Sequence, residues 1–168
     1  MNNNQRAGNT TQWPVRPEVQ QYREAMAELV ASFEPTHFIT LAFNRDSVSM
    51  AGARATIHRF HGFLDHACLG PKWQKKVQQR SSYVGVVEKP RTHFHVHLAV
   101  KVAPGVRVSA DEVACLWKKL VPSGSVDVQA VKDGYGLGRY IAKDIVPETS
   151  ERIFVSPWPE TIEPRSIS

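Results

Sequence analysis

Residues 83–102 read YVGVVEKPRTHFHVHLAVKV, and the fold prediction starts from this stretch. Two apolar, partly β-branched runs, Tyr83–Glu88 and His93–Val102, are separated by Lys-Pro-Arg-Thr. Runs of this kind around a short, proline-containing connection predict a tight antiparallel hairpin. A turn centred on Pro90 and Arg91 would place Glu88 directly opposite His93, on the same face of the sheet.

The remaining elements follow from apolar periodicity and from helix-capping and helix-breaking residues. Expected helices cover residues 17–33, 49–68, about 109–120 and 139–145, and expected strands cover 37–44, 83–88, 93–102, 125–131 and 152–155. Asp46 or Ser47 is expected to cap the second helix, Ser109 with Glu112 the third, and residues 134–138 to form a loose glycine-rich turn. Without the first and last helices the order is βαββαβ. This order predicts an α+β fold, a ferredoxin-like antiparallel sheet (split βαβ) with helices packed on it.

Composition and length indicate one globular domain. The chain has 168 residues, of which 42% are hydrophobic and 22% charged. We expect a disordered tail over residues 1–14, a single domain over 15–156 and an irregular tail over 157–168. The formal net charge of +5 fits either a polyanionic partner or simple solubility.

Two features concern the cellular location. The two cysteines, Cys68 and Cys115, lie in separate segments, which is typical of a protein in a reducing cytoplasm. No apolar run approaches the roughly 18 residues of a membrane-spanning helix, so we expect no membrane partner.

Three histidines alternate with apolar residues in the second run of the hairpin. Side chains of a strand alternate between its faces, so His93, His95 and His97 should share one face and the apolar residues the other. Imidazole is a common metal ligand, but His93 and His97 would start about 13 Å apart, too far to share one ion easily. With Glu88 opposite His93, we predict a mixed site of Glu88, His93 and His95 for Mg²⁺ or Mn²⁺, with His97 as a flanking residue or substitute ligand.

A second histidine group occurs in the helix expected over residues 49–68. His58, His61 and Asp65 share a helix face by their i, i+3, i+7 spacing. Such groups are usually incidental on a solvated helix, so the strand site is the stronger prediction.

Tyr140 and Lys143 are three residues apart in the last expected helix and should share one face. A neighbouring cation lowers the free energy needed to ionise a phenol, which favours Tyr140 as a nucleophile. Tyr135 has no lysine three residues later, so we interpret it as structural or as a substrate contact.

Three motifs in this order resemble those of the HUH endonucleases, in particular the rolling-circle replication initiators (Rep proteins). They are the strand FITLAF at residues 38–43, a His–apolar–His pair, and Tyr140-Ile-Ala-Lys143. The resemblance covers about residues 36–146. It leaves open whether the ligand pair is His93 with His95 or His95 with His97.

The resemblance implies a HUH-nuclease type of fold and a single-stranded DNA partner, an origin hairpin or nick site of a plasmid, phage or related element. Tyr140 would attack a phosphodiester to give a 5′-phosphotyrosine and a free 3′-hydroxyl. The histidines would hold Mn²⁺ or Mg²⁺ at the scissile phosphate.

Basic side chains are candidates for contacts with DNA phosphates, although a solvated basic face explains each of them equally well. They are Lys72, Lys75, Lys76 and Arg80, together with Lys118 and Lys119.

Two other functions fit parts of the pattern. One is a non-catalytic ferredoxin-like module that binds nucleic acid, although such sheets expose aromatic side chains where this one places histidines. The other is a metallohydrolase that activates water and forms no covalent intermediate.

Overall fold

Strand β3 lies at the centre of a five-stranded sheet in which every neighbouring pair is antiparallel. The structure is a computed structural model, and it describes residues 16–45 and 47–156. The strand order is β4-β1-β3-β2-β5. The strands are β1 (His37–Ala42), β2 (Ser82–Glu88), β3 (His95–Lys101), β4 (Ser125–Ala130) and β5 (Ile153–Val155).

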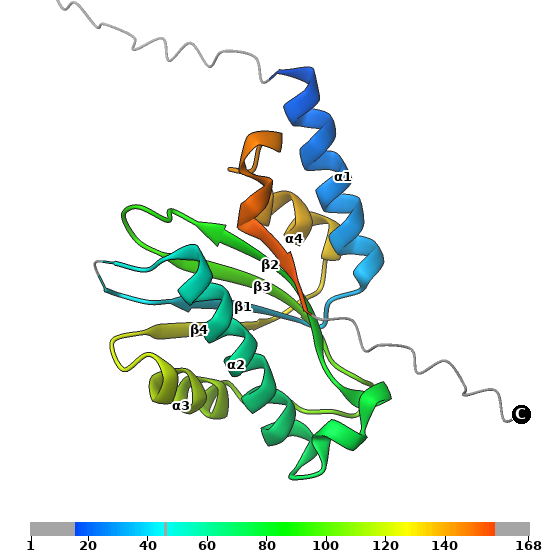
Figure 1. Cartoon of the computed structure of the whole chain (residues 1–168). Helices are drawn as coiled ribbons and strands as arrows, with labels where there is room; N and C mark the ends of the chain where they lie inside the picture. The colour runs from blue at the N-terminus through cyan, green and yellow to red at the C-terminus, as the bar shows by residue number, and fades with distance from the viewer. Residues whose placement is uncertain (1–15, 46, 157–168) are drawn as a thin grey trace, which may run out of the picture.

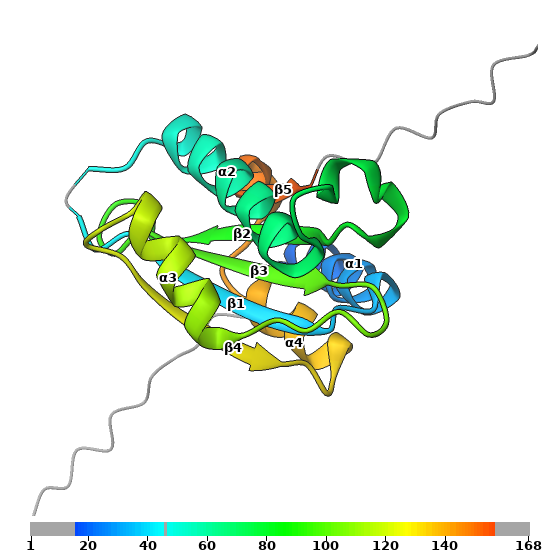
Figure 2. The same cartoon turned by 90° about the horizontal axis from the view of Figure 1, so that it is seen from below.

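Helices cover both faces of this sheet. Figures 1 and 2 show α2 and α3 together over one face, and α1 and α4 over the other. The helices are α1 (Pro17–Phe33), α2 (Met50–Leu69), α3 (Ala110–Leu120) and α4 (Gly134–Ile141), with 3-10 turns η1 (Trp73–Lys75), η2 (Val77–Gln79) and η3 (Pro147–Arg152).

The alternation of β3 assigns its side chains to two separate cores. Val96 and Leu98 belong to the larger core, beneath α2 and α3, which also contains Phe60 and Trp117. The intervening Ala99 lies in a smaller core with apolar residues of α1 and α4. His95 and His97 therefore lie on the face that α1 and α4 cover, because they differ from Ala99 by even steps.

The predicted α+β class and the antiparallel sheet are confirmed, and the strand order is consistent with a ferredoxin-like fold. Ser109 caps α3 as predicted, since its hydroxyl accepts a hydrogen bond from the Glu112 amide. The cap of α2 was predicted at the wrong residue, because Ser49 caps it and accepts from the Gly52 amide. Asp46 and the two predicted tails, residues 1–14 and 157–168, lie outside the described residues.

The predicted register of the hairpin is wrong. Glu88 is paired with His95, and His93 lies before the start of β3 with its side chain exposed. The connection is longer than predicted, because residues 89–94 all lie outside the strands and Lys89 adopts a left-handed conformation. The acidic residue therefore faces a histidine two positions further along the chain.

The glycine-rich segment 134–138 is helical rather than loose. Helix α4 begins at Gly134, where the Asp133 carboxylate accepts a hydrogen bond from the Gly136 amide at 2.9 Å. The cap satisfies a backbone donor that a helix start leaves free, and it offsets the low helix propensity of glycine.

Close packing against α1 sets the position of α4. A Cβ atom on Gly138 would lie 2.6 Å from Ala27 Cα and 2.8 Å from its carbonyl oxygen, too close for any side chain. At Gly134, one turn earlier, the nearest atom would be Ala31 Cα at 3.5 Å, an ordinary contact. The two helices can therefore approach this closely only while residue 138 is glycine.

We expect Gly138→Ala to lower the free energy of unfolding by about 1–3 kcal/mol, because the methyl group forces α4 away from α1. Gly134→Ala is the matched control and should leave stability unchanged or slightly raised, since alanine favours helix. Urea denaturation followed by circular dichroism measures both variants. Equal stability of the Gly138→Ala protein and the wild type would contradict this packing.

Candidate functional site

His97 is the best-anchored polar side chain on the α1–α4 face of the sheet. It is 4% exposed, and its Nδ1 lies 3.0 Å from the hydroxyl of Thr40, its register partner on β1. Its Nε2 lies 2.6 Å from Oε2 of Glu88. Because a carboxylate only accepts, Nε2 carries a proton, and in the neutral ring the Thr40 hydroxyl donates to Nδ1.

Glu88 joins His97 to Lys143. Its Oε1 lies 3.0 Å from Lys143 Nζ, while Oε2 accepts from His97. Burial on its own would raise the pKa of the Glu88 carboxyl, but the hydrogen bonds from His97 and Lys143 lower it to about 2. Glu88 is therefore a carboxylate throughout the physiological pH range.

Tyr140 lies in the last turn of α4, in contact with His97 and Lys143, the two partners of Glu88. Its ring meets the rings of Phe38 and His97 edge to face, with centroids 5.9 and 5.8 Å apart. Lys143 Nζ lies 4.2 Å from the centre of the ring. The ring is thus held by several contacts, yet the residue is 46% exposed and accessible to a large ligand.

Lys143 was predicted on the helix but lies in the turn that follows α4. The predicted proximity is still present, because the Lys143 amide donates to the Tyr140 carbonyl at 3.3 Å. Burial works to lower the pKa of Lys143, but the hydrogen bond and the charge of Glu88 raise it above its usual value. The side chain is therefore an ammonium at neutral pH and cannot serve as a base.

The structure separates the three histidines of the hairpin. His95 is half-buried opposite Glu88, and burial, with help from His97, lowers the pKa of its imidazole. His93 is exposed in the loop, so of the two ligand pairs that the sequence left open only His95 with His97 lies within the strand. Glu88 contacts His97 and is the register partner of His95.

Thr40 and Phe38 were not among the predicted site residues. Both lie on β1 and contact His97, one through a hydrogen bond and the other by ring stacking at 5.4 Å. The signal for Thr40 was present in the sequence, as a polar residue inside the otherwise apolar motif FITLAF.

The predicted DNA-contacting residues of 72–80 lie at the far end of the sheet. They precede Ser82, which is six residues, or about 20 Å, along β2 from Glu88. Two of them have local structural partners. Lys76 Nζ donates to the Leu69 carbonyl at the end of α2, and Arg80 pairs with Asp65 at 2.9 Å.

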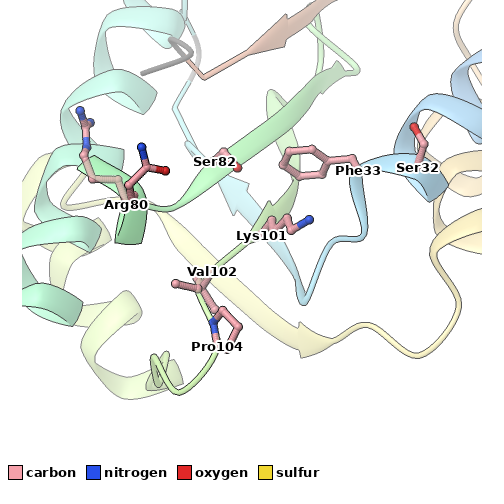
Figure 3. A pocket seen from close by; sticks show the side chains of 9 residues that line it. Ser32, Phe33, Arg80, Ser82, Lys101, Val102 and Pro104 are labelled. Carbon is pink, nitrogen blue, oxygen red and sulfur yellow. The ribbon is translucent and has the colours of Figure 1, made fainter. Parts of the chain in front are cut away.

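Arg80 also lines a cavity of about 430 Å³ at this far end, which Figure 3 shows. Ser82 and Lys101, which are register partners at the opposite end of the hairpin from Glu88, line the same cavity. Lys72 and Lys75 are exposed in the 3-10 segment. None of these side chains adjoins Tyr140, so any contact of theirs with a ligand is remote from the site.

The second histidine group is a structural network and does not form a site. His61 and Asp65 are buried, whereas His58 is exposed. Asp65 accepts from the Ser81 amide and hydroxyl, and His61 Nε2 donates to the Ser81 carbonyl at 2.8 Å. These bonds fix the chain where it enters β2. Tyr135, the other tyrosine of α4, likewise has a structural partner and donates to the Glu24 carboxylate.

Comparison with protein-family models, with curated proteins and with solved structures finds no match. Over residues 16–45 and 47–156, no group of three or more His, Cys, Asp or Glu side chains is arranged so as to hold a metal ion. Among the helices that the structure describes, none has the length and apolar content needed to cross a membrane.

The buried network predicts a pH effect on stability. Burial lowers the pKa of His61 below its ordinary value of 6.5, more than nearby Asp65 raises it. The unfolded chain then binds the proton more readily, so stability is lost as the pH falls below 6.5. Between pH 7.5 and 5.5 the wild type should lose up to about 1.4 kcal/mol more than His61→Gln, whose amide keeps a donor but does not titrate.

Urea denaturation of both proteins at pH 7.5 and 5.5 measures this difference. The comparison cancels the contributions of the other titrating groups, which the two proteins share. The same pH dependence in both would show that His61 binds protons equally in the folded and unfolded states.

Proposed function

We propose that this chain is a metal-dependent endonuclease of the HUH type, which nicks and rejoins single-stranded DNA through a tyrosine nucleophile. One observation carries the proposal. Four side chains from separate elements are in direct contact. They are Tyr140 from α4, Lys143 from the turn after it, Glu88 from β2 and His97 from β3. Initiation of rolling-circle replication of a plasmid, phage or related element is the process that we propose for it.

Tyr140 is the nucleophile in this proposal. Its ring is held against His97 and Phe38 while nearly half of the residue is exposed, as attack on a bulky phosphodiester requires. The Lys143 ammonium lies 4.2 Å from the centre of the ring, so a positive charge stands beside the side chain that would attack the phosphate. Glu88 holds this ammonium in place.

The cleavage step balances as a transesterification. The Tyr140 oxygen forms a bond to phosphorus as the bond from phosphorus to the 3′ oxygen breaks. The phenol proton passes to solvent, the 3′ oxygen takes a proton from Lys143, and Lys143 regains one from solvent. The products are a 5′-phosphotyrosine and a free 3′-hydroxyl, and the reverse reaction rejoins a strand.

Glu88, His95 and His97 have the donor types that bind a divalent cation, one carboxylate and two imidazoles, but they are not arranged so as to hold an ion in this structure. Binding through Nε2 would require the other tautomer of His97, in which Nδ1 carries the proton and donates to the Thr40 hydroxyl, and this bond would orient the ring. Glu88 and His97 now touch at 2.6 Å, whereas two ligands at right angles on one ion are about 3 Å apart. The two side chains must therefore separate slightly for binding. A bound Mn²⁺ or Mg²⁺ supplies a Lewis acid for the scissile phosphate.

We expect the wild type to form a covalent adduct with members of a randomised single-stranded oligonucleotide pool in the presence of Mn²⁺. Tyr140→Phe should form none, because phenylalanine has no attacking oxygen. Tyr135→Phe, on the same helix, is the matched control and should retain the adduct. Denaturing electrophoresis detects the product, and sequencing of the captured DNA identifies the cleaved site.

The alternatives give different results in this assay. An adduct with Tyr140→Phe would show that another residue is the nucleophile. Cleavage without an adduct would favour the water-activating metallohydrolase, and binding without cleavage in any divalent metal would favour the non-catalytic module.

The three histidines can be distinguished by single substitutions. We expect His95→Ala and His97→Ala to lower Mn²⁺-dependent adduct formation by about 100-fold or more, since each removes a proposed ligand. His93→Ala removes an exposed loop residue and should react like the wild type. Calorimetric titration should show weakened Mn²⁺ binding in the His95→Ala and His97→Ala proteins and unchanged binding in His93→Ala. Circular dichroism checks that each variant is folded. Loss of Mn²⁺ binding in His93→Ala would contradict this ligand set.

A further inference from the structure

A cavity of about 320 Å³ is lined by residues of α1 and α4 and by Lys143, the side chain that contacts the Tyr140 ring. Its lining is entirely polar or charged and consists of Gln20, Arg23, Glu24, Arg139 and Lys143. Lys143 is already paired with Glu88, so the charge excess of the lining comes from Arg23 and Arg139 against Glu24, whose carboxylate already accepts the hydroxyl of Tyr135. A cavity with this charge balance favours an anion.

Lys143 connects the cavity to the candidate site around Tyr140. It lines the cavity and also lies against the Tyr140 ring and Glu88. Arg139 immediately precedes Tyr140, and it is four residues before Lys143, on the same side of the helical turn. An anion in the cavity would consequently lie next to whatever group Tyr140 attacks.

The cavity walls are fixed by contacts that need no ligand. Arg23 donates through Nε to the Ile145 carbonyl at 3.2 Å, which ties α1 to the segment after α4. This bond uses one of the five N–H donors of the guanidinium. The contact of Gly138 with Ala27 sets the separation of the two helices. Walls that are already ordered reduce the free energy needed to bind a charged group.

We propose that this cavity binds a backbone phosphate of the DNA strand adjacent to the scissile one, with Arg139 and Arg23 as its positioning residues. The inference rests on the proposed function and adds a second phosphate contact to it. Such a contact sets the position of the strand on the protein and carries no sequence information of its own.

The test measures binding of a short fluorescein-labelled oligodeoxythymidylate as a function of NaCl concentration, in a Tyr140→Phe background that prevents reaction. Each phosphate contact to single-stranded DNA contributes about 0.7 to the slope of log K against log salt. Arg139→Ala should lower the magnitude of the slope by about 0.7, and Arg139→Lys should restore it because the charge is kept. Arg59→Ala removes an exposed arginine of α2 and should leave the slope unchanged.

A second measurement locates the contact. In the captured DNA sequence, a neutral methylphosphonate replaces one phosphate at a time. In the Tyr140→Phe background, one position flanking the scissile phosphate should weaken binding, and the same substitution should have no further effect when Arg139 is also alanine.

The outcomes separate this inference from the proposed function. The adduct is measured with Arg139→Ala as the only change, and the salt slope with Arg139→Ala in the Tyr140→Phe background. A wild-type rate of adduct formation together with the full salt slope overturns the cavity assignment and leaves the nuclease proposal standing. If the wild type neither binds the oligonucleotide nor forms an adduct, both proposals fail together. A lowered slope in Arg59→Ala as well would overturn the assignment of the contact to this cavity.

Discussion

Strand β3 places alternate side chains in two different environments, and its register with the neighbouring strands determines which side chains lie in each. Val96 and Leu98 pack beneath α2 and α3, while His95 and His97 lie on the face of α1 and α4. A slip of one residue would move the imidazoles into the apolar core. The free energy of core packing thus also keeps the histidines on the face where they meet Glu88 and α4.

The Glu88 carboxylate shows how a buried charge contributes to site geometry. A carboxylate that is largely removed from water is destabilising unless charged or hydrogen-bonded partners compensate it. Here His97 and Lys143 do so, one from the neighbouring strand and the other from the turn after α4. The same bonds that keep Glu88 ionised therefore connect the sheet to the segment that carries Tyr140. Fold stability and the alignment of the site depend on one group.

Local properties of the chain were predictable from the sequence, and properties set by tertiary contacts were not. Alternation over residues 95–100 was enough to predict which β3 side chains share a face, because the strand period is local, whereas His93, included in the same prediction, lies before the strand. The pairing of Glu88 with His95 was missed because register depends on the conformation of the connecting loop. The early start of α4 was missed for two reasons: the local cap at Asp133 was outweighed by the low helix propensity of the glycines that follow it, and the fit of Gly138 against α1 is a tertiary contact.

A side chain at residue 138 would meet the backbone of Ala27, its Cα and its carbonyl oxygen, and not its methyl group. Because every residue type has these atoms, no replacement at position 27 makes room for a larger residue at 138. We therefore expect glycine to be kept at position 138 among relatives of this chain, while the residue at position 27 varies with less restriction. Retention of this one glycine would preserve the placement of Tyr140 where other contacts between the two helices change.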